Sequence, residues 1–181
     1  MPKSPLSLKG LIPTLAGELH MTPAALYERQ RALVRAGLIK SEGGKGPGSG
    51  VRATPHSVAM LLIAVLAADS LSEIEEGTKR IAWLKAESGI CPVTNKKTFA
   101  TALAAILASP SLARSAHRIT VHRAGTLAPG AYIDFKMKDA EPSSYFVSAK
   151  HKRPGKLHTT ASLMGFPLQI LADLLAPWFA K

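Results

Sequence analysis

Two helix boundaries lie close together near the N-terminus, in the segment Leu15–Ile39, LAGELHMTPAALYERQRALVRAGLI. Residues 6–20 carry leucines at helical spacing, and Pro13 is expected to begin a helix there rather than to lie inside one. Thr22-Pro23 is a favoured N-cap and first residue for the next helix, and Gly37 is typical of the position just beyond a helix end. The segment therefore predicts two helices joined by a tight turn.

A glycine-rich stretch follows the second helix, and its flanks look like short strands. We expect Leu38–Lys40 and Val51–Ala53 to form a hairpin around it. Its glycines match neither G-x-x-x-x-G-K-[ST] nor G-x-G-x-x-G, so a loop that binds nucleotide phosphates is not expected. A flexible linker also fits the composition, but the strand-like flanks favour the tip of a hairpin.

The rest of the chain changes from helical to strand periodicity. Thr54-Pro55 begins an apolar helix, Ser72-x-x-Glu75 reads as the capping box of a polar helix, and Thr94 opens another. Alternating apolar residues then predict three strands near residues 119–121, 133–137 and 144–149, with a final helix after Gly165. The expected fold is α+β and mostly helical, with a small antiparallel three-stranded sheet and a C-terminal helix.

The order of two short helices, a tight turn, a third helix that ends in Ala-Gly-Leu-Ile and then a hairpin is that of a winged helix-turn-helix, and the residues of Leu15–Ile39 resemble those of MarR-like DNA-binding regulators. The matching positions are the apolar residues of both helices, the cap, and the Gly-Leu-Ile that enters the wing: Leu15, Ala16, Leu19, Thr22, Leu26, Leu33, Gly37, Leu38 and Ile39. The resemblance covers the N-terminal third. It implies a DNA-binding domain over residues 1–60, a helical linker or dimerisation region over 61–110 and a small α+β domain over 111–181.

The resemblance also implies how such a protein would meet DNA. The N-terminal face of the second helix would enter the major groove, with Arg31 bonding guanine, Glu28 accepting from cytosine and Ala24 touching a thymine methyl group. The remaining candidates in this third are residues expected at the same face, at phosphates or in the wing: Thr22, Pro23, Tyr27, Arg29, Arg35, Lys45 and Arg52. An ordinary solvated position for Arg35 and a core position for Tyr27 remain open.

Charge favours the same class of partner. The net charge is +11, with eight Lys/Arg against three Asp/Glu in residues 1–60 and ten against four in residues 111–181. Such basic ends favour a polyanion, with double-stranded DNA ahead of a membrane surface. Lys150, Lys152 and Arg153 form a second basic stretch that extends this footprint or, equally, is a solvated loop.

Motifs for other functions are missing from the sequence. The single cysteine, Cys91, is expected to pack as a small apolar residue, and the six histidines show no metal-ligand spacing. No G-x-S-x-G elbow is present, so neither an enzyme nor a cofactor is expected. The longest apolar run, Val58–Ala68, is shorter than the roughly 20 residues that cross a bilayer. The shortness of this run and the absence of a signal-peptide pattern favour a cytoplasmic, nucleoid-associated bacterial or phage protein.

The leading hypothesis is a sequence-specific transcriptional regulator that binds double-stranded DNA as a homodimer. Two alternatives stay open on the same residues. The first is a phage or plasmid DNA-binding factor, such as a terminase small subunit or a replication or partition protein. The second is a winged-helix module that binds protein.

Overall fold

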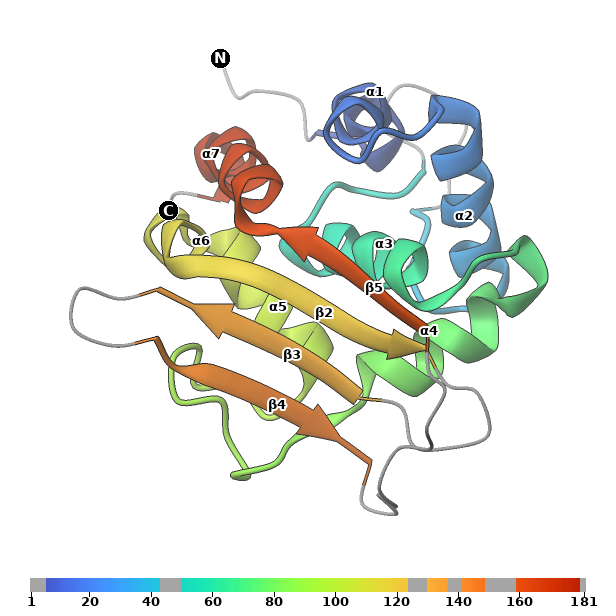
Figure 1. The fold of residues 1–181 in the computed structure, drawn as a ribbon. Coiled ribbons are helices and arrows are strands. Elements are labelled where there is room, and N and C mark those ends of the chain that lie inside the picture. Colours follow the sequence, from blue (N-terminus) through green and yellow to red (C-terminus); the bar gives the residue numbers. More distant parts are fainter. Residues whose placement is uncertain (1–5, 43–49, 124–129, 137–140, 149–158, 180–181) are drawn as a thin grey trace.

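A computed structural model describes residues 6–42, 50–123, 130–136, 141–148 and 159–179. Figure 1 shows helices behind and above a single antiparallel sheet. In chain order the elements are α1 (Leu8–Glu18), α2 (Pro23–Arg35), α3 (Pro55–Ala67), η1 (Leu71–Glu73), α4 (Ile74–Ala82), β1 (Lys85–Ala86), α5 (Phe99–Ala108), α6 (Pro110–Ser115), β2 (Ala116–Arg123), β3 (Gly130–Phe135), β4 (Ser143–Val147), β5 (Thr159–Met164) and α7 (Gly165–Phe179). The predicted α+β class is confirmed.

Backbone and side-chain hydrogen bonds close the tight turn between α1 and α2, first at the end of α1 and then at the start of α2. The N–H of Met21 donates to the Ala16 carbonyl at 2.9 Å across His20, which has a φ of 50°. Thr22 then caps α2, its hydroxyl accepting from the N–H of Ala25 at 3.2 Å. This arrangement satisfies backbone groups that a helix end leaves without partners, and it allows α2 to start immediately.

α2 ends as its sequence predicts. Gly37 has a φ of 68°, and the N–H of Leu38 donates to the Leu33 carbonyl at 2.9 Å, which is the hydrogen bond of a Schellman motif. The expectation for Pro13 is wrong, because this residue lies inside α1. α1 nevertheless continues past it, since Leu11, Ile12 and Leu15 are buried and hold both of its halves against the core.

Three short extended segments lie beside these helices. Glu42 and Gly50 exchange both backbone hydrogen bonds, at 2.9 and 3.0 Å, and Ser7 pairs with Arg52. The expected pairing of Leu38–Lys40 with Val51–Ala53 is therefore wrong, because Val51–Ala53 pairs with residues 6–8 at the start of α1 and the contact after α2 is that of Glu42 with Gly50. The segment 43–49 lies outside the described residues.

α3 is the central helix of the fold. It contacts α2, α4 and α5, and residues from Ser57 to Ala64 are all buried. Its start follows the predicted Thr54-Pro55 cap, with Ser57 completing a capping box. α3 runs through residue 60, where the sequence suggested a domain boundary, and one connected apolar core extends from α1 to α7.

The polar helix after α3 differs from its prediction at both ends. The capping box is Ser70 with Glu73 rather than Ser72 with Glu75. α4 ends at Ala82 rather than near Ala86, because Lys85–Ala86 pairs with β4 as strand β1. A partner about 60 residues away in the chain therefore decides where this helix ends.

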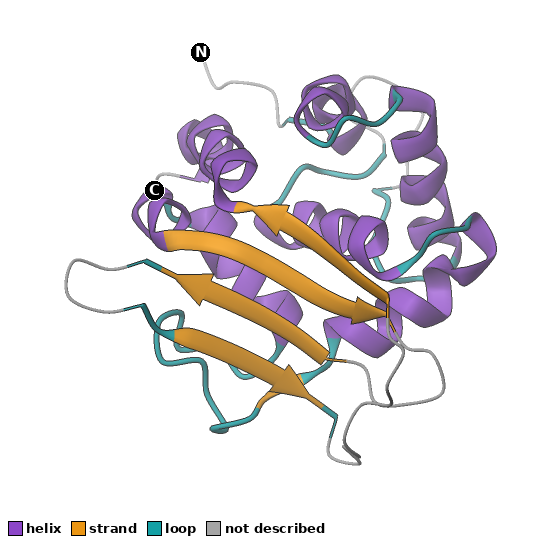
Figure 2. Cartoon of the chain, in the orientation of Figure 1, coloured by secondary structure: helices purple, strands orange, loops and turns teal. Residues whose placement is uncertain are grey.

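The sheet has the strand order β1-β4-β3-β2-β5, and every neighbouring pair is antiparallel. Helices cover one face of the sheet (Figure 2). The strands carry alternating buried apolar residues, Ile119, Val121, Ile133, Phe135 and Phe146. The three predicted strands are present, but the three-stranded count is wrong. β1 has two residues and β5 (TTASLM) alternates weakly, so neither gives a strong signal in the sequence.

Gly165 joins the sheet to α7 at a very close approach. A Cβ at this position would overlap the carbonyl oxygen of Ala116, so the chain here requires glycine. This approach places α7 beside β2 and closes the apolar core at Leu168 and Leu171.

Candidate nucleic-acid interface

α2 has one buried and one exposed face. Leu26 and Leu33 are fully buried against the core, whereas Ala24, Arg31 and Arg35 are exposed. These three residues lie on one side because they follow at intervals of seven and four residues on a helix. The side of α2 that turns away from the core is therefore partly basic.

The start of α2 carries three more predicted residues. Thr22 and Pro23 are exposed, but the Thr22 hydroxyl is already engaged in the cap. Tyr27 is half-buried and packs against the apolar core, with the Nζ atom of Lys9 lying 5.4 Å from its ring centre. Tyr27 thus combines the two positions expected for it, part core and part surface.

Two residues expected to contact bases are paired with each other in the structure. Arg31 donates to the Glu28 carboxylate at 2.9 Å, and their side chains are 57% and 40% exposed. An exposed pair of this kind contributes at most about 1 kcal/mol, so a DNA base or phosphate can replace either partner at small cost.

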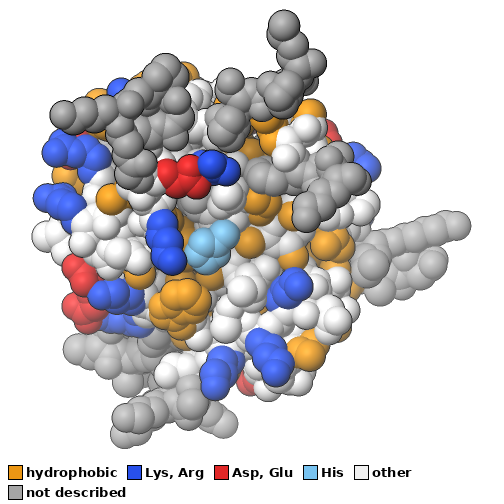
Figure 3. All heavy atoms as spheres, turned by 180° about the vertical axis from the view of Figure 1, so that it is seen from behind, with side chains coloured by type: hydrophobic (Ala, Val, Ile, Leu, Met, Phe, Trp, Pro, Cys, Tyr) orange, Lys and Arg blue, Asp and Glu red, His pale blue; other side chains and the backbone are white. Residues whose placement is uncertain are grey.

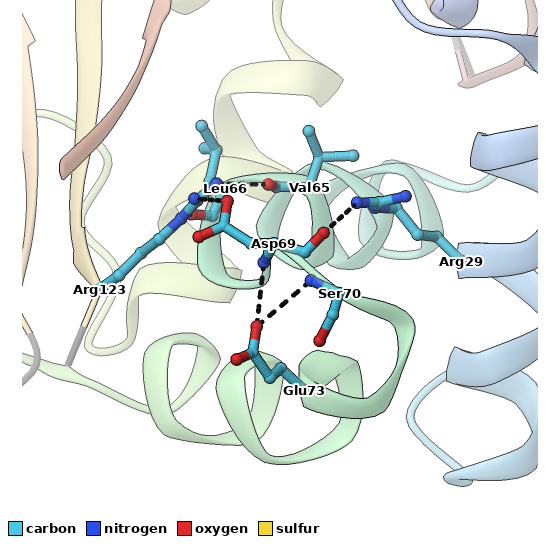
Figure 4. Close-up of polar contacts among 7 residues, drawn as sticks. All are labelled: Arg29, Val65, Leu66, Asp69, Ser70, Glu73 and Arg123. Atoms are coloured by element: carbon cyan, nitrogen blue, oxygen red, sulfur yellow. Dashed lines mark hydrogen bonds and ion pairs between the residues drawn. The ribbon is translucent and has the colours of Figure 1, made fainter. Parts of the chain in front are cut away.

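Arg29 lies on a different side of α2 from Arg31. Its guanidinium is directed at the turn that follows α3, where it donates to the Asp69 carbonyl at 3.4 Å (Figure 4). Its Nε atom is buried and has no partner among the described residues. The structure therefore separates Arg29 from Arg31 and Arg35.

The same turn also receives an arginine from the sheet, and we refer to Asp69 with Arg29 and Arg123 as the Asp69 cluster. Arg123, at the end of β2, donates to the carbonyls of Leu66 and Val65 at 2.6 and 3.2 Å and forms an ion pair with the Asp69 carboxylate (Figure 4). Sequence analysis missed Arg123 and Asp69, because no local pattern relates residues 54 positions apart.

Arg52 lies where the extended segments meet. It is exposed and pairs with the Glu42 carboxylate at 2.6 Å, beside the Glu42–Gly50 backbone pair. The other basic candidates, Lys45, Lys150, Lys152 and Arg153, lie outside the described residues.

A cavity of about 440 Å³ lies between the start of α1, the outer side of α2 and the extended segment at Gly50–Val51. Arg31 and Arg35 line it together with Lys9 and Gln30, two residues that sequence analysis did not single out. On the helical side of the molecule, Lys and Arg side chains outnumber Asp and Glu (Figure 3). The hollow beside α2 itself carries three basic side chains, those of Lys9, Arg31 and Arg35.

The open face of the sheet offers a second group of polar residues. Tyr132 and Tyr145 stack on each other with ring centres 4.1 Å apart, and His122 meets the Tyr132 ring edge-on at 5.1 Å. Burial raises the pKa of Tyr145 above its ordinary value, and its hydrogen bond to Tyr132 adds to the rise. One face of each tyrosine ring is therefore covered by the other ring.

Cys91 is fully buried, as its prediction as a packing residue requires. Burial alone would raise the pKa of the thiol, but hydrogen bonds from Ser144, Thr94 and Val93 outweigh it and lower the pKa. Across the described ranges, His, Cys, Asp and Glu side chains nowhere gather in a group of three or more that would hold a metal ion. In the same ranges no helix combines the length and apolar character needed to cross a membrane.

Comparison with known proteins gives no relative: no family model, curated protein or solved structure matches this chain.

Proposed function

We propose that this protein binds double-stranded DNA through the outer face of α2 and acts as a sequence-specific transcriptional regulator. The observation that carries the proposal is the composition of that face. Ala24, Glu28, Arg31 and Arg35 occupy it together, and none of them is needed to bury the helix. They are the side-chain types that contact thymine methyl groups, cytosine amino groups, guanine and phosphates.

The surroundings of α2 support a winged helix-turn-helix arrangement. α1 leads into α2 through a turn of three residues between Glu18 and Thr22, and α3 packs against α2 as a third helix. Glu42 pairs with Gly50 just after α2, and Arg52 follows two residues later, as a wing at this position would require. In such an arrangement the second helix enters the major groove while the hairpin reaches the neighbouring backbone.

The charges of this region fit the electrostatic part of DNA binding. Arg31, Arg35 and Arg52 are exposed on or beside α2, and each ion pair they form is itself exposed. Such side chains exchange their carboxylate partners for phosphates readily, with release of counterions from the DNA.

A titration of labelled duplex DNA tests the proposal. We expect fluorescence anisotropy to show binding to a random-sequence duplex that weakens with a slope of about −0.9 in log K against log salt for each phosphate contact, between about 50 and 200 mM salt. Selection from a randomised duplex library should enrich one sequence motif. Failure to bind duplex DNA at the lower salt concentration would sink the proposal.

A further inference from the structure

The cavity beside α2 has the chemistry of an anion site. Its volume of about 440 Å³ lies within the range of roughly 300–1,000 Å³ that is usual for small-molecule sites. Three cations line it, Lys9 from α1 and Arg31 and Arg35 from α2; the described lining residues include no acidic side chain, although Arg31 is paired with Glu28 beside the cavity. Hydroxyl groups of Ser7, Tyr27 and Ser41 complete its polar lining.

Lys9 lies at the N-terminal end of a helix, where a cation is disfavoured, and its Nζ atom lies 5.4 Å from the centre of the Tyr27 ring. It is the second residue of the eleven-residue α1, and the first turn of that helix holds no acidic residue. The N-terminal end of a helix carries partial positive charge, which disfavours a cation and favours an anion. An anion in the cavity would be attracted by Lys9 and by the helix end together.

Gln30 provides an independent indication of a ligand. This residue lines the cavity and is 7% exposed, and its Oε1 atom has no donor within the described part of the chain. A buried amide oxygen without a donor is costly, and most such groups in proteins have a partner. Because Oε1 only accepts hydrogen bonds, the group that it lacks is a donor, such as a hydroxyl group of a bound molecule.

We propose that this cavity binds a small phosphorylated molecule, a phosphate monoester of a nucleoside or polyol. The phosphate is held by Lys9, Arg31 and Arg35, and the Gln30 Oε1 atom accepts a hydrogen bond from a neighbouring hydroxyl group of the molecule. Arginine and lysine are suited to phosphate, since charge-assisted hydrogen bonds to its oxygens are shorter and stronger than those between neutral groups.

Occupancy of this cavity has a consequence for DNA that rests on the function proposed above. Arg31 and Arg35 belong both to the cavity and to the outer face of α2. A ligand that occupies these two side chains withdraws them from DNA, so the phosphorylated molecule and the duplex exclude each other. Phosphate-bound protein is then the form with low DNA affinity.

Calorimetric titration with adenosine 5′-monophosphate, set against adenosine and against sodium chloride of equal ionic strength, tests the site itself. We expect saturable binding of the monophosphate and binding of adenosine weaker by about tenfold or more. Lys9→Met and Gln30→Met should each weaken monophosphate binding about tenfold. Arg114→Met, which alters an exposed arginine on α6, should leave it unchanged. Thermal melting checks the fold, and Lys9 is exposed, so its variant reports even if the Gln30 variant is unstable.

The outcomes separate the site from its consequence for DNA. Equal binding of monophosphate and adenosine, an effect reproduced by salt alone, or insensitivity to Lys9→Met would overturn the proposal. Lys9→Met that weakens duplex binding while the monophosphate fails to bind would assign the cavity to a backbone phosphate and would also overturn it. Monophosphate binding by a protein that binds no duplex supports the site and rejects the proposed function. In a protein that binds both, the monophosphate should displace duplex from the wild type far better than from Gln30→Met.

Discussion

Arginines of two neighbouring regions, the outer face of α2 and the Asp69 cluster, have contrasting surroundings. Arg31 is 57% exposed and pairs with a side chain of its own helix. Arg123 is 19% exposed and reaches two backbone carbonyls and a carboxylate of another element. Arg29 lies on the same helix as Arg31, but like Arg123 it contacts Asp69. Net charge therefore does not indicate which cations are available to a partner. The contacts of each side chain indicate it instead.

The largest effect on stability is expected at Arg123. Arg123→Met removes the hydrogen bonds to the Leu66 and Val65 carbonyls and leaves these groups partly buried without a charged donor. We expect a loss of about 2–3 kcal/mol in the free energy of unfolding, measured by urea denaturation. A loss within experimental error would mean that the Asp69 cluster does not hold the sheet to α3.

The outer face of α2 should respond in the opposite way. Arg31→Ala should weaken specific duplex binding by about 1–3 kcal/mol and change the free energy of unfolding by less than about 0.5 kcal/mol. Anisotropy titration and urea denaturation measure the two quantities. Arg114→Ala is the matched control, because Arg114 is an exposed, ion-paired arginine on a distant helix. Equal affinities of the two variants would contradict a role for this face.

Arg29 tests the distinction between the two regions, because it lies on α2 but its guanidinium contacts the Asp69 carbonyl. Arg29→Met loses two long hydrogen bonds, of 3.4 and 3.5 Å, and also removes a buried Nε atom without a partner. The two changes partly cancel, so we expect a destabilisation of about 1 kcal/mol, read from thermal melting. Duplex affinity should stay at the wild-type value. A large drop in affinity would place Arg29 in the interface instead.

The smallest effect is expected at Glu28. Glu28→Gln removes a negative charge from the outer face and releases Arg31 from its ion pair. Binding to random-sequence duplex should strengthen by less than about 1 kcal/mol, with almost no change in stability. The gain should shrink as salt is added, and weaker binding at low salt would argue against an electrostatic contact at this face.

Local signals made the first helices predictable. Thr22, Pro23 and Gly37 act within one turn of the helix that they bound, so α2 was located from its sequence within one residue. The local preference of Pro13 for the first turn of a helix gives a wrong prediction, because burial of its neighbours keeps it inside α1. Strands β1 and β5 and the early end of α4 depend on partners far along the chain, and no local pattern encodes them.

The candidate site is likewise predictable only where its residues lie on one helix. Helical spacing indicated that Ala24, Glu28 and Arg31 face outward together. The separate position of Arg29 depends on Asp69, 40 residues later, and the cavity needs Lys9, Gln30 and Gly50 to be brought together by the fold. Tertiary contacts, rather than sequence patterns, distinguish a structural arginine from one that is exposed and available to a partner.

Mapping of the bound duplex on the protein by nuclear magnetic resonance tests the central claim most directly. Titration of the isotopically labelled protein with a selected duplex should shift the amide signals of Thr22 to Arg35 and of Gly50 to Arg52. The signals of α6 and of the Tyr132–Tyr145 pair should stay in place. Shifts confined to the open face of the sheet, with α2 unaffected, would contradict the assignment of α2 as the helix that binds DNA.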